Sequence, residues 1–82
     1  DAVSPGETNA AIRAMVDGLA GRLERSPRDI EGWTRLIRSR VVLGERDVAA
    51  AAVRKALDVF KDDVAATTSI KAAADEFGLR PE

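Results

Sequence analysis

The sequence lacks several side chains on which enzymes and metal sites commonly depend. It contains no histidine, no cysteine and no tyrosine. These absences remove the commonest general acid or base, the thiol nucleophile and the usual zinc ligands. A catalytic site would have to be built from Asp, Glu, Lys, Ser and Thr alone. We therefore predict that the protein is not an enzyme, with no catalytic residues, no metal site and no cofactor.

The sequence also lacks a long apolar run and an excess of charge of either sign. No apolar segment approaches the roughly 20 residues of a membrane span, and no signal peptide is visible. The 82 residues carry 13 basic and 14 acidic side chains, for a net charge of -1, whereas nucleic-acid-binding domains usually carry a clear positive excess. We expect no nucleic-acid partner and no direct membrane contact by this domain.

The strongest positive signal in the sequence is helical periodicity. Apolar residues recur three and four positions apart along four segments, and no alternating run bounded by turn residues indicates a strand. We predict one all-α domain over residues 1–82, with an N-terminal tail at 1–4 and helices at about 5–25, 30–43, 48–60 and 64–77. Because the chain begins with Asp and not with Met, we expect it to be part of a longer protein.

Short polar residues and glycines mark the expected ends of these helices. The N-cap candidates precede each apolar stripe: Ser4 (in a capping box with Glu7), Asp29, Asp47, and Asp62 or Asp63. Gly44 and Gly78 are expected to supply left-handed turns at the ends of the second and fourth helices.

Two features of the apolar stripes need a packing explanation. Met15 and Val64 are expected to face inward on the first and fourth helices. Gly18 and Gly21 lie inside the first helix, where each costs up to about 1 kcal/mol relative to alanine. Close approach of a neighbouring helix would explain both glycines.

The helices repeat with a period of 34 residues. Asp29 matches Asp63, Leu36 matches Ile70, and Leu43-Gly44 matches Phe77-Gly78 at this spacing. Helix-turn-helix units with this period are typical of tetratricopeptide repeats. We predict tetratricopeptide-like helical hairpins arranged as half a repeat, one full repeat and another half. The alternative is an ordinary four-helix bundle with coincidental spacing.

The full repeat, residues 30–63, resembles the tetratricopeptide pattern at its signature positions. We predict a structural core that contains Trp33, Leu36, Gly44, Ala49, Ala56 and Leu57. The small residues Ala49 and Ala56 let the two helices of the hairpin approach closely. The pattern departs from the family at three positions, because Ile37, Arg40 and Lys61 stand where relatives prefer a small residue, Tyr and Pro.

Stacked repeats of this kind present the first helix of each pair on a concave side. We predict a partner-binding groove from residues at three- and four-residue steps on the second and fourth helices: Glu31, Thr34, Arg38, Val41, Ala65, Thr68, Ala72 and Asp75. Small side chains beside a few polar ones leave room for a bound helix or strand. For any single arginine of this region, the alternative is a solvated surface residue with local ion pairs.

A DNA-binding helix-turn-helix is the remote alternative for residues 38–57. Its second helix would have to present polar side chains to base edges. The run from Val48 to Val53 consists of alanine and valine only, so it offers few hydrogen-bond donors.

Residues 10–47, AAIRAMVDGLAGRLERSPRDIEGWTRLIRSRVVLGERD, resemble a narrower family. They are similar to the periplasmic tetratricopeptide region of the bacterial cytochrome c maturation family CcmI, also called CycH. The family motifs fall on Met15-Val16, Leu19-Ala20, Arg22-Leu23, Pro27, Asp29, Glu31-Gly32-Trp33, Arg35-Leu36, Arg38 and Val42-Leu43-Gly44. The ending AAADEFGL, residues 72–79, resembles that of alphaproteobacterial members.

This resemblance implies a chaperone role in a membrane-anchored periplasmic protein. In the family, the repeats hold unfolded apocytochrome c by its C-terminal helix and deliver it to the haem ligation complex. The expected partners are therefore apocytochrome c and proteins of that complex. The alternative is a generic tetratricopeptide module that assembles another bacterial complex.

Overall fold

Four α-helices make up the part of the protein that the computed structural model describes, residues 5–79. They are α1 (Pro5–Arg25), α2 (Ile30–Val42), α3 (Arg46–Val59) and α4 (Val64–Glu76), and no strand occurs among these residues. The all-α prediction is confirmed. The predicted tail at 1–4 and the capping box of Ser4 and Glu7 lie outside the described residues and side chains.

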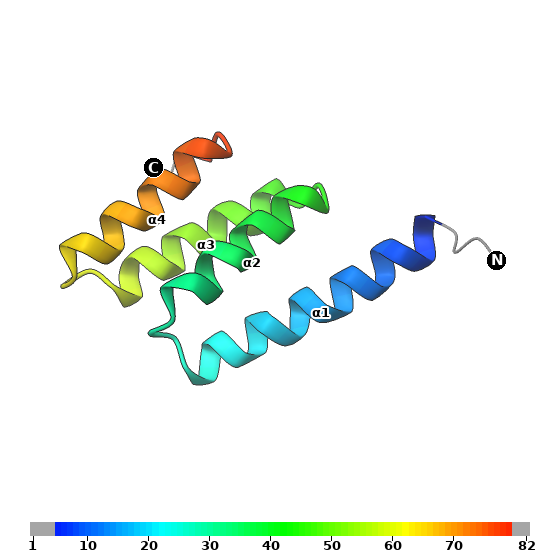
Figure 1. The fold of residues 1–82 in the computed structure, drawn as a ribbon, viewed down its shortest axis with the longest axis horizontal. Helices are drawn as coiled ribbons and strands as arrows, with labels where there is room; N and C mark the ends of the chain where they lie inside the picture. Colours follow the sequence, from blue (N-terminus) through cyan, green and yellow to red (C-terminus); the bar gives the residue numbers. More distant parts are fainter. Residues whose placement is uncertain (1–4, 80–82) are drawn as a thin grey trace.

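The helices stack as successive hairpins and do not close into a ring. α2 and α3 form the central hairpin, with α1 packed on α2 and α4 packed on both α2 and α3. In Figure 1, α1 and α4 lie on opposite sides of this hairpin, and the N-terminal turns of α1 extend past the end of α2. In each helix-turn-helix hairpin of the repeat, α2 and α4 occupy the position of the first helix. α1 and α3 occupy the position of the second helix, as the 34-residue period predicts.

The ends of α2 and α4 have the same capping residues and the same turns. The Asp29 carboxylate accepts a hydrogen bond from the Gly32 backbone at 3.0 Å, and Asp63 accepts one from Ala66 at 3.1 Å. Both are N-caps, which supply an acceptor for otherwise unpaired amides. Gly44 and Gly78 follow these helices with φ of 80° and 72°, the left-handed conformation that glycine adopts without strain.

The start of α3 differs from the prediction. The helix begins at Arg46 and not at 48, and its N-cap is Glu45, which makes no side-chain capping bond. Asp47, predicted as the cap, lies in the first turn. The reason is the short connection: Gly44 ends the preceding turn, and the Glu45 carboxylate is already paired with Arg40 and Arg13.

A continuous apolar core runs between the helices. Its buried members are Val16, Leu23, Trp33, Leu36, Ile37, Ala49, Ala52, Val53, Ala56, Phe60, Ala66, Ile70, Ala74 and Leu79. Of the predicted core residues, Leu57 is half-buried, and Gly44 is exposed because it contributes the turn and no side chain. The Trp33 indole lies in this core and donates a hydrogen bond to the Pro27 carbonyl.

Two side chains predicted to face inward are exposed. Met15 is 75% exposed and Val64 is 78% exposed. Among the described helices the backbone of α1 comes close to α2 alone, and only side chains such as Glu24 reach α3, so much of the surface of α1, including Met15, has no neighbour. Val64 is exposed because it is the first residue of α4 and lies at the N-terminal end of that helix.

The explanation expected for Gly18 and Gly21 is also wrong. A Cβ added at either glycine would have no atom within 4 Å outside its own helix and neighbours. The close approach between α1 and α2 occurs instead at Gly32, where an added Cβ would lie 2.8 Å from a methyl group of Leu23. Gly32 is therefore required by packing, whereas Gly18 and Gly21 are not.

The outer side of α4 is more polar than the corresponding side of α2. Thirty-four residues after the buried Trp33 and Ile37, α4 carries the half-buried Thr67 and the exposed Lys71. Within residues 5–79, no helix combines the length and the apolar character needed to cross a membrane.

Candidate partner-binding surface

The predicted groove residues of α2 form one stripe on its surface. Glu31 and Arg38 are exposed, whereas Thr34 and Val41 are half-buried. Thr34 donates its hydroxyl to the Ile30 carbonyl at 3.0 Å, so its methyl group remains for contact with a partner. A hollow of about 290 Å³ follows this stripe, lined by Ile30, Glu31, Thr34, Arg35 and Arg38. We call it the α2 hollow.

The predicted groove residues of α4 form a second, shallower stripe. Ala65, Thr68, Ala72 and Asp75 are all exposed. None of them lines the α2 hollow, although α4 packs directly on α2. The eight predicted residues thus lie on two neighbouring helices, but the hollow runs along α2 only.

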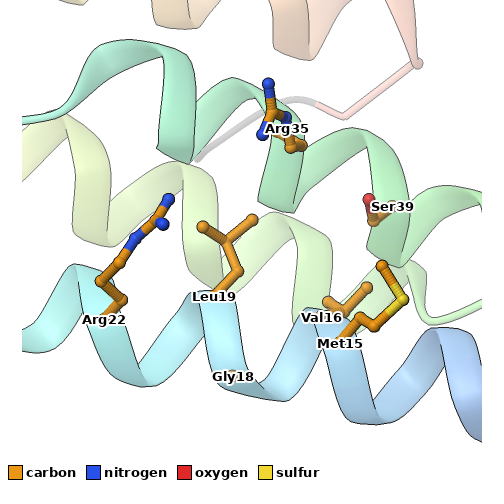
Figure 2. A pocket seen from close by; sticks show the side chains of 7 residues that line it. All are labelled: Met15, Val16, Gly18, Leu19, Arg22, Arg35 and Ser39. Carbon is orange, nitrogen blue, oxygen red and sulfur yellow. The ribbon is translucent and has the colours of Figure 1, made fainter.

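A second hollow, which was not predicted from the sequence, lies between α1 and α2. It measures about 260 Å³ and is lined by Met15, Val16, Gly18, Leu19, Arg22, Arg35 and Ser39. Figure 2 shows Arg22, Leu19 and Met15 in succession along α1, with Arg35 and Ser39 on the neighbouring α2. We call this the α1–α2 hollow. The signal that could have revealed it is the apolar pair Met15 and Leu19 beside Arg22 on the first helix.

A smaller hollow of about 160 Å³ lies on another side, between α1 and the α2–α3 hairpin. The walls are mainly apolar, with Trp33 and Leu36 from α2 and Val48, Ala51 and Ala52 from α3. Glu24 and Lys55, both in its lining, approach each other to 3.8 Å.

Arg40 connects α1 to the turn of the central hairpin. Its guanidinium lies 3.0 Å from an Asp17 oxygen and 2.9 Å from a Glu45 oxygen, and Arg13 reaches the second Glu45 oxygen at 3.2 Å. The Arg40 side chain is only 11% exposed. Where the tetratricopeptide pattern prefers Tyr, this chain therefore has a charged network. Charge-assisted hydrogen bonds of this kind are stronger than neutral ones.

Two further arginines bind the ends of helices. Arg46 donates to the carbonyls of Phe77 and Gly78 at 2.8 Å and 3.3 Å. Arg28 donates to the Val59 carbonyl at 3.4 Å, and its guanidinium carbon lies 5.3 Å from the centre of the Phe60 ring. Cations are favoured at helix C-termini, where unpaired carbonyls gather negative charge.

These contacts separate structural arginines from surface ones. Arg28, Arg40 and Arg46 hold helices together, whereas Arg35 and Arg38 take part in no ion pair among the residues that the structure describes. Arg35 and Arg38 are both exposed on α2. They are free to meet a carboxylate on a partner.

The described residues show no arrangement of side chains that would hold a metal ion, because no group of three or more acidic, histidine or cysteine side chains comes together between residues 5 and 79. The surface instead combines shallow apolar hollows with unpaired guanidinium groups, an arrangement suited to short helical segments with acidic side chains.

Comparison with known proteins shows two clear relatives. The chain is 42% identical over 77 residues to the cytochrome c-type biogenesis protein CycH of Rhizobium meliloti (strain 1021) and 35% identical over 77 residues to the protein of that name from Bradyrhizobium diazoefficiens. Each match covers 94% of this chain, but the chain spans only 20% and 21% of the length of these relatives. No family model matches the chain, and no solved structure matches it significantly.

Proposed function

The chain belongs to the CycH family of cytochrome c-type biogenesis proteins, and we propose that it is a protein-binding holdase domain for cytochrome c maturation. In this proposal it captures apocytochrome c by the C-terminal helix of that chain. It then passes the apocytochrome to proteins of the haem ligation complex. The domain has no catalytic role, and it acts in the periplasm as part of a membrane-anchored protein.

The observation that carries this proposal is the match to two CycH relatives along 94% of the chain. The surface of α2 is consistent with it. The α2 hollow has a threonine and an isoleucine in its lining, with the unpaired Arg35 and Arg38 beside them. An amphipathic helix can lay its apolar face in such a hollow and direct a carboxylate to an arginine.

Shallow contact also fits the task of a carrier. The α2 hollow is open and its charges are exposed, and exposed ion pairs each contribute at most about 1 kcal/mol. Binding through such contacts is reversible, which a holdase requires because it must release the apocytochrome.

Calorimetry with a peptide from the C-terminal helix of a c-type cytochrome tests the proposal. We expect measurable heat from this peptide and none from a scrambled peptide of the same composition. Arg38→Ala should weaken binding by about fivefold, the equivalent of one exposed ion pair. The matched control is Arg54→Ala, because Arg54 is exposed on α3 and lines none of the three hollows described.

Two outcomes would contradict the proposal. Equal heats from the native and scrambled peptides would remove the specific recognition of the cytochrome helix and would leave a generic tetratricopeptide module. Normal binding by Arg38→Ala would show that the predicted groove residues are wrongly assigned.

A further inference from the structure

The hollow of about 160 Å³ between α1 and the α2–α3 hairpin is bounded by described helices on both sides. α1 forms one wall and α3 forms the other, and α2 contributes the buried Trp33 and Leu36 between them. We call it the α1–α3 hollow. It shares no lining residue with the α2 hollow or with the α1–α2 hollow.

The internal repeat shows that a further helix of the stack does not cover this hollow. Its wall on α1 consists of Ala20 and Glu24, and the residues 34 positions later are Arg54 and Asp58 on α3. Both are exposed, although α3 has a helical neighbour before it, α2, and one after it, α4. The corresponding face of a second helix thus stays open in a complete hairpin. The other wall belongs to α3 itself, whose neighbours are both present.

The α1–α3 hollow has the size and the apolar lining that an aromatic ring requires. Its volume is about 160 Å³, and in another protein an apolar cavity of roughly 150 Å³ binds benzene. Its walls are mainly small side chains, Ala20 on α1 and Ala51 and Ala52 on α3, together with Val48, which is 45% exposed. A flat ring can therefore enter between the two walls without displacing a large side chain.

The position that would supply a ring from the chain itself carries an arginine. Arg40 lines the hollow and stands where the tetratricopeptide pattern has tyrosine. Its guanidinium is held 3.0 Å from an Asp17 oxygen and 2.9 Å from a Glu45 oxygen. This side chain is therefore fixed by neighbouring carboxylates and brings no ring into the hollow.

The charges in the lining favour an aromatic ring over an aliphatic side chain. Arg40 and Lys55 both line the hollow, against one acidic lining residue, Glu24. The Lys55 side chain is 58% exposed, and its ammonium lies 3.8 Å from a Glu24 oxygen on the opposite wall. Because an exposed pair of this kind contributes little, the ammonium is free to move over a bound ring. A cation in that position is attracted by the π electrons of the ring.

We propose that the α1–α3 hollow docks one phenylalanine side chain of a partner protein, with the ring against Trp33 and Leu36 and the Lys55 ammonium over its face. Phenylalanine suits the hollow better than tyrosine, because the Trp33 indole N–H is already bonded to the Pro27 carbonyl and a buried hydroxyl without a partner is unfavourable. The site lies apart from the predicted groove on α2 and α4, and it does not depend on the proposed holdase function.

A second copy of this chain is a poor source of the ring. The 82 residues contain one tryptophan, two phenylalanines and no tyrosine. Trp33 and Phe60 are buried in the core, and Phe77 is half-buried at the end of α4. None of the three is exposed, so the ring must come from outside these 82 residues.

The test is an NMR titration of the 82-residue chain with N-acetyl-phenylalanine amide, which presents one phenylalanine side chain between two peptide groups. We expect ring-current shifts of the Val48 and Ala51 methyl signals and none of the Met15 methyl signal, because Met15 lies in the other hollow. The affinity should exceed that of N-acetyl-alanine amide at least about fivefold, because the ring adds apolar burial. The cyclohexylalanine analogue has a similar bulk but no π electrons, and it should bind more weakly.

Two pairs of variants make the test specific to the hollow. Ala51→Leu should lower the affinity at least about fivefold, because the longer side chain takes up part of the space. Ala72→Leu is its control, since Ala72 is exposed on α4 and lines none of the three hollows. Lys55→Gln should reduce the preference for the aromatic compound over its cyclohexyl analogue, whereas Lys71→Gln, a change of an exposed lysine on α4, should not. Circular dichroism confirms that each variant is folded.

Several results would overturn the proposal. They are equal affinities for the phenylalanine and alanine compounds, stronger binding of the cyclohexyl analogue, or unaltered binding by Ala51→Leu. A longer form of the protein that does not bind the compound would show that its own chain fills the hollow, which also contradicts a partner protein. Arg38→Ala should leave this binding unaffected, which separates the result from the test of the cytochrome helix.

Discussion

The indole nitrogen of Trp33 donates a hydrogen bond of 2.6 Å to the carbonyl oxygen of Pro27. This bond ties the first helix of the central hairpin to the loop that follows α1. Because the ring is buried and its one polar atom is paired, the residue contributes both apolar burial and a satisfied donor.

Trp33→Ala should unfold most of the domain. Removing a buried tryptophan typically costs about 3–5 kcal/mol, and a chain of this size has a free energy of unfolding on the order of 5 kcal/mol. Trp33→Phe keeps most of the apolar surface and should be less damaging. Urea denaturation followed by circular dichroism measures both. Equal stability of the alanine variant and the unchanged chain would show that the ring is not part of the core.

Arg40→Ala should destabilise the fold more than Asp17→Ala. Arg40 is nearly buried and joins two carboxylates, whereas the Asp17 side chain is 61% exposed. Losing the partly buried arginine should cost about 1–3 kcal/mol, because its carboxylate partners lose a charge-assisted bond. Losing the exposed partner should cost at most about 1 kcal/mol. Thermal melts show which of the two variants is less stable. A larger loss of stability in Asp17→Ala than in Arg40→Ala would contradict the role of Arg40 as the centre of this ion-pair network.

Gly18 and Gly21 of α1 and Gly32 of α2 should respond in opposite directions to alanine. Gly18→Ala and Gly21→Ala should each stabilise the domain by up to about 1 kcal/mol, because alanine is the better helix former and nothing obstructs its methyl group. Gly32→Ala should destabilise it, since its methyl group would press on Leu23 and on the capping Asp29. The urea denaturation midpoints of the three variants, compared with that of the unchanged chain, measure these changes in stability. A loss of stability in Gly18→Ala would contradict the open surface around this glycine.

Arg46→Ala should weaken the end of α4. The guanidinium donates to the Phe77 and Gly78 carbonyls, and a cation at a helix C-terminus contributes about 0.3–1 kcal/mol. The effect should shrink as salt rises, because the site is exposed and screened. Arg54→Ala serves as the control. Hydrogen exchange of the last turn of α4 is the direct readout, and unchanged protection would count against the contact.

The helices and their repeat could be predicted from the sequence because their determinants are local. Asp29 and Asp63 recur with their capped amides, and Gly44 and Gly78 recur with positive φ. Each of these signals depends on a few neighbouring residues. Asp47 failed as a cap because α3 already begins at Arg46, directly after the turn at Gly44, which places Asp47 inside the first turn of the helix.

The surface was less predictable because it depends on which neighbours a helix has. Met15 carries the same apolar signal as Leu23, yet only Leu23 finds a partner, at Gly32. Arg38 and Arg40 are two residues apart in one basic run, but one is exposed on α2 and the other is held by Asp17 and Glu45. Periodicity assigns a residue to a face but does not tell what lies against that face.

The polar outer side of α4 gives the stack a direction of growth. A helix added beyond α4 would have to bury the Lys71 ammonium, which stands 34 residues after the buried Ile37, and desolvating such a charge without a counter-ion is strongly unfavourable. An engineered array built from this unit would therefore lengthen from its amino-terminal end, with α4 as its terminal cap.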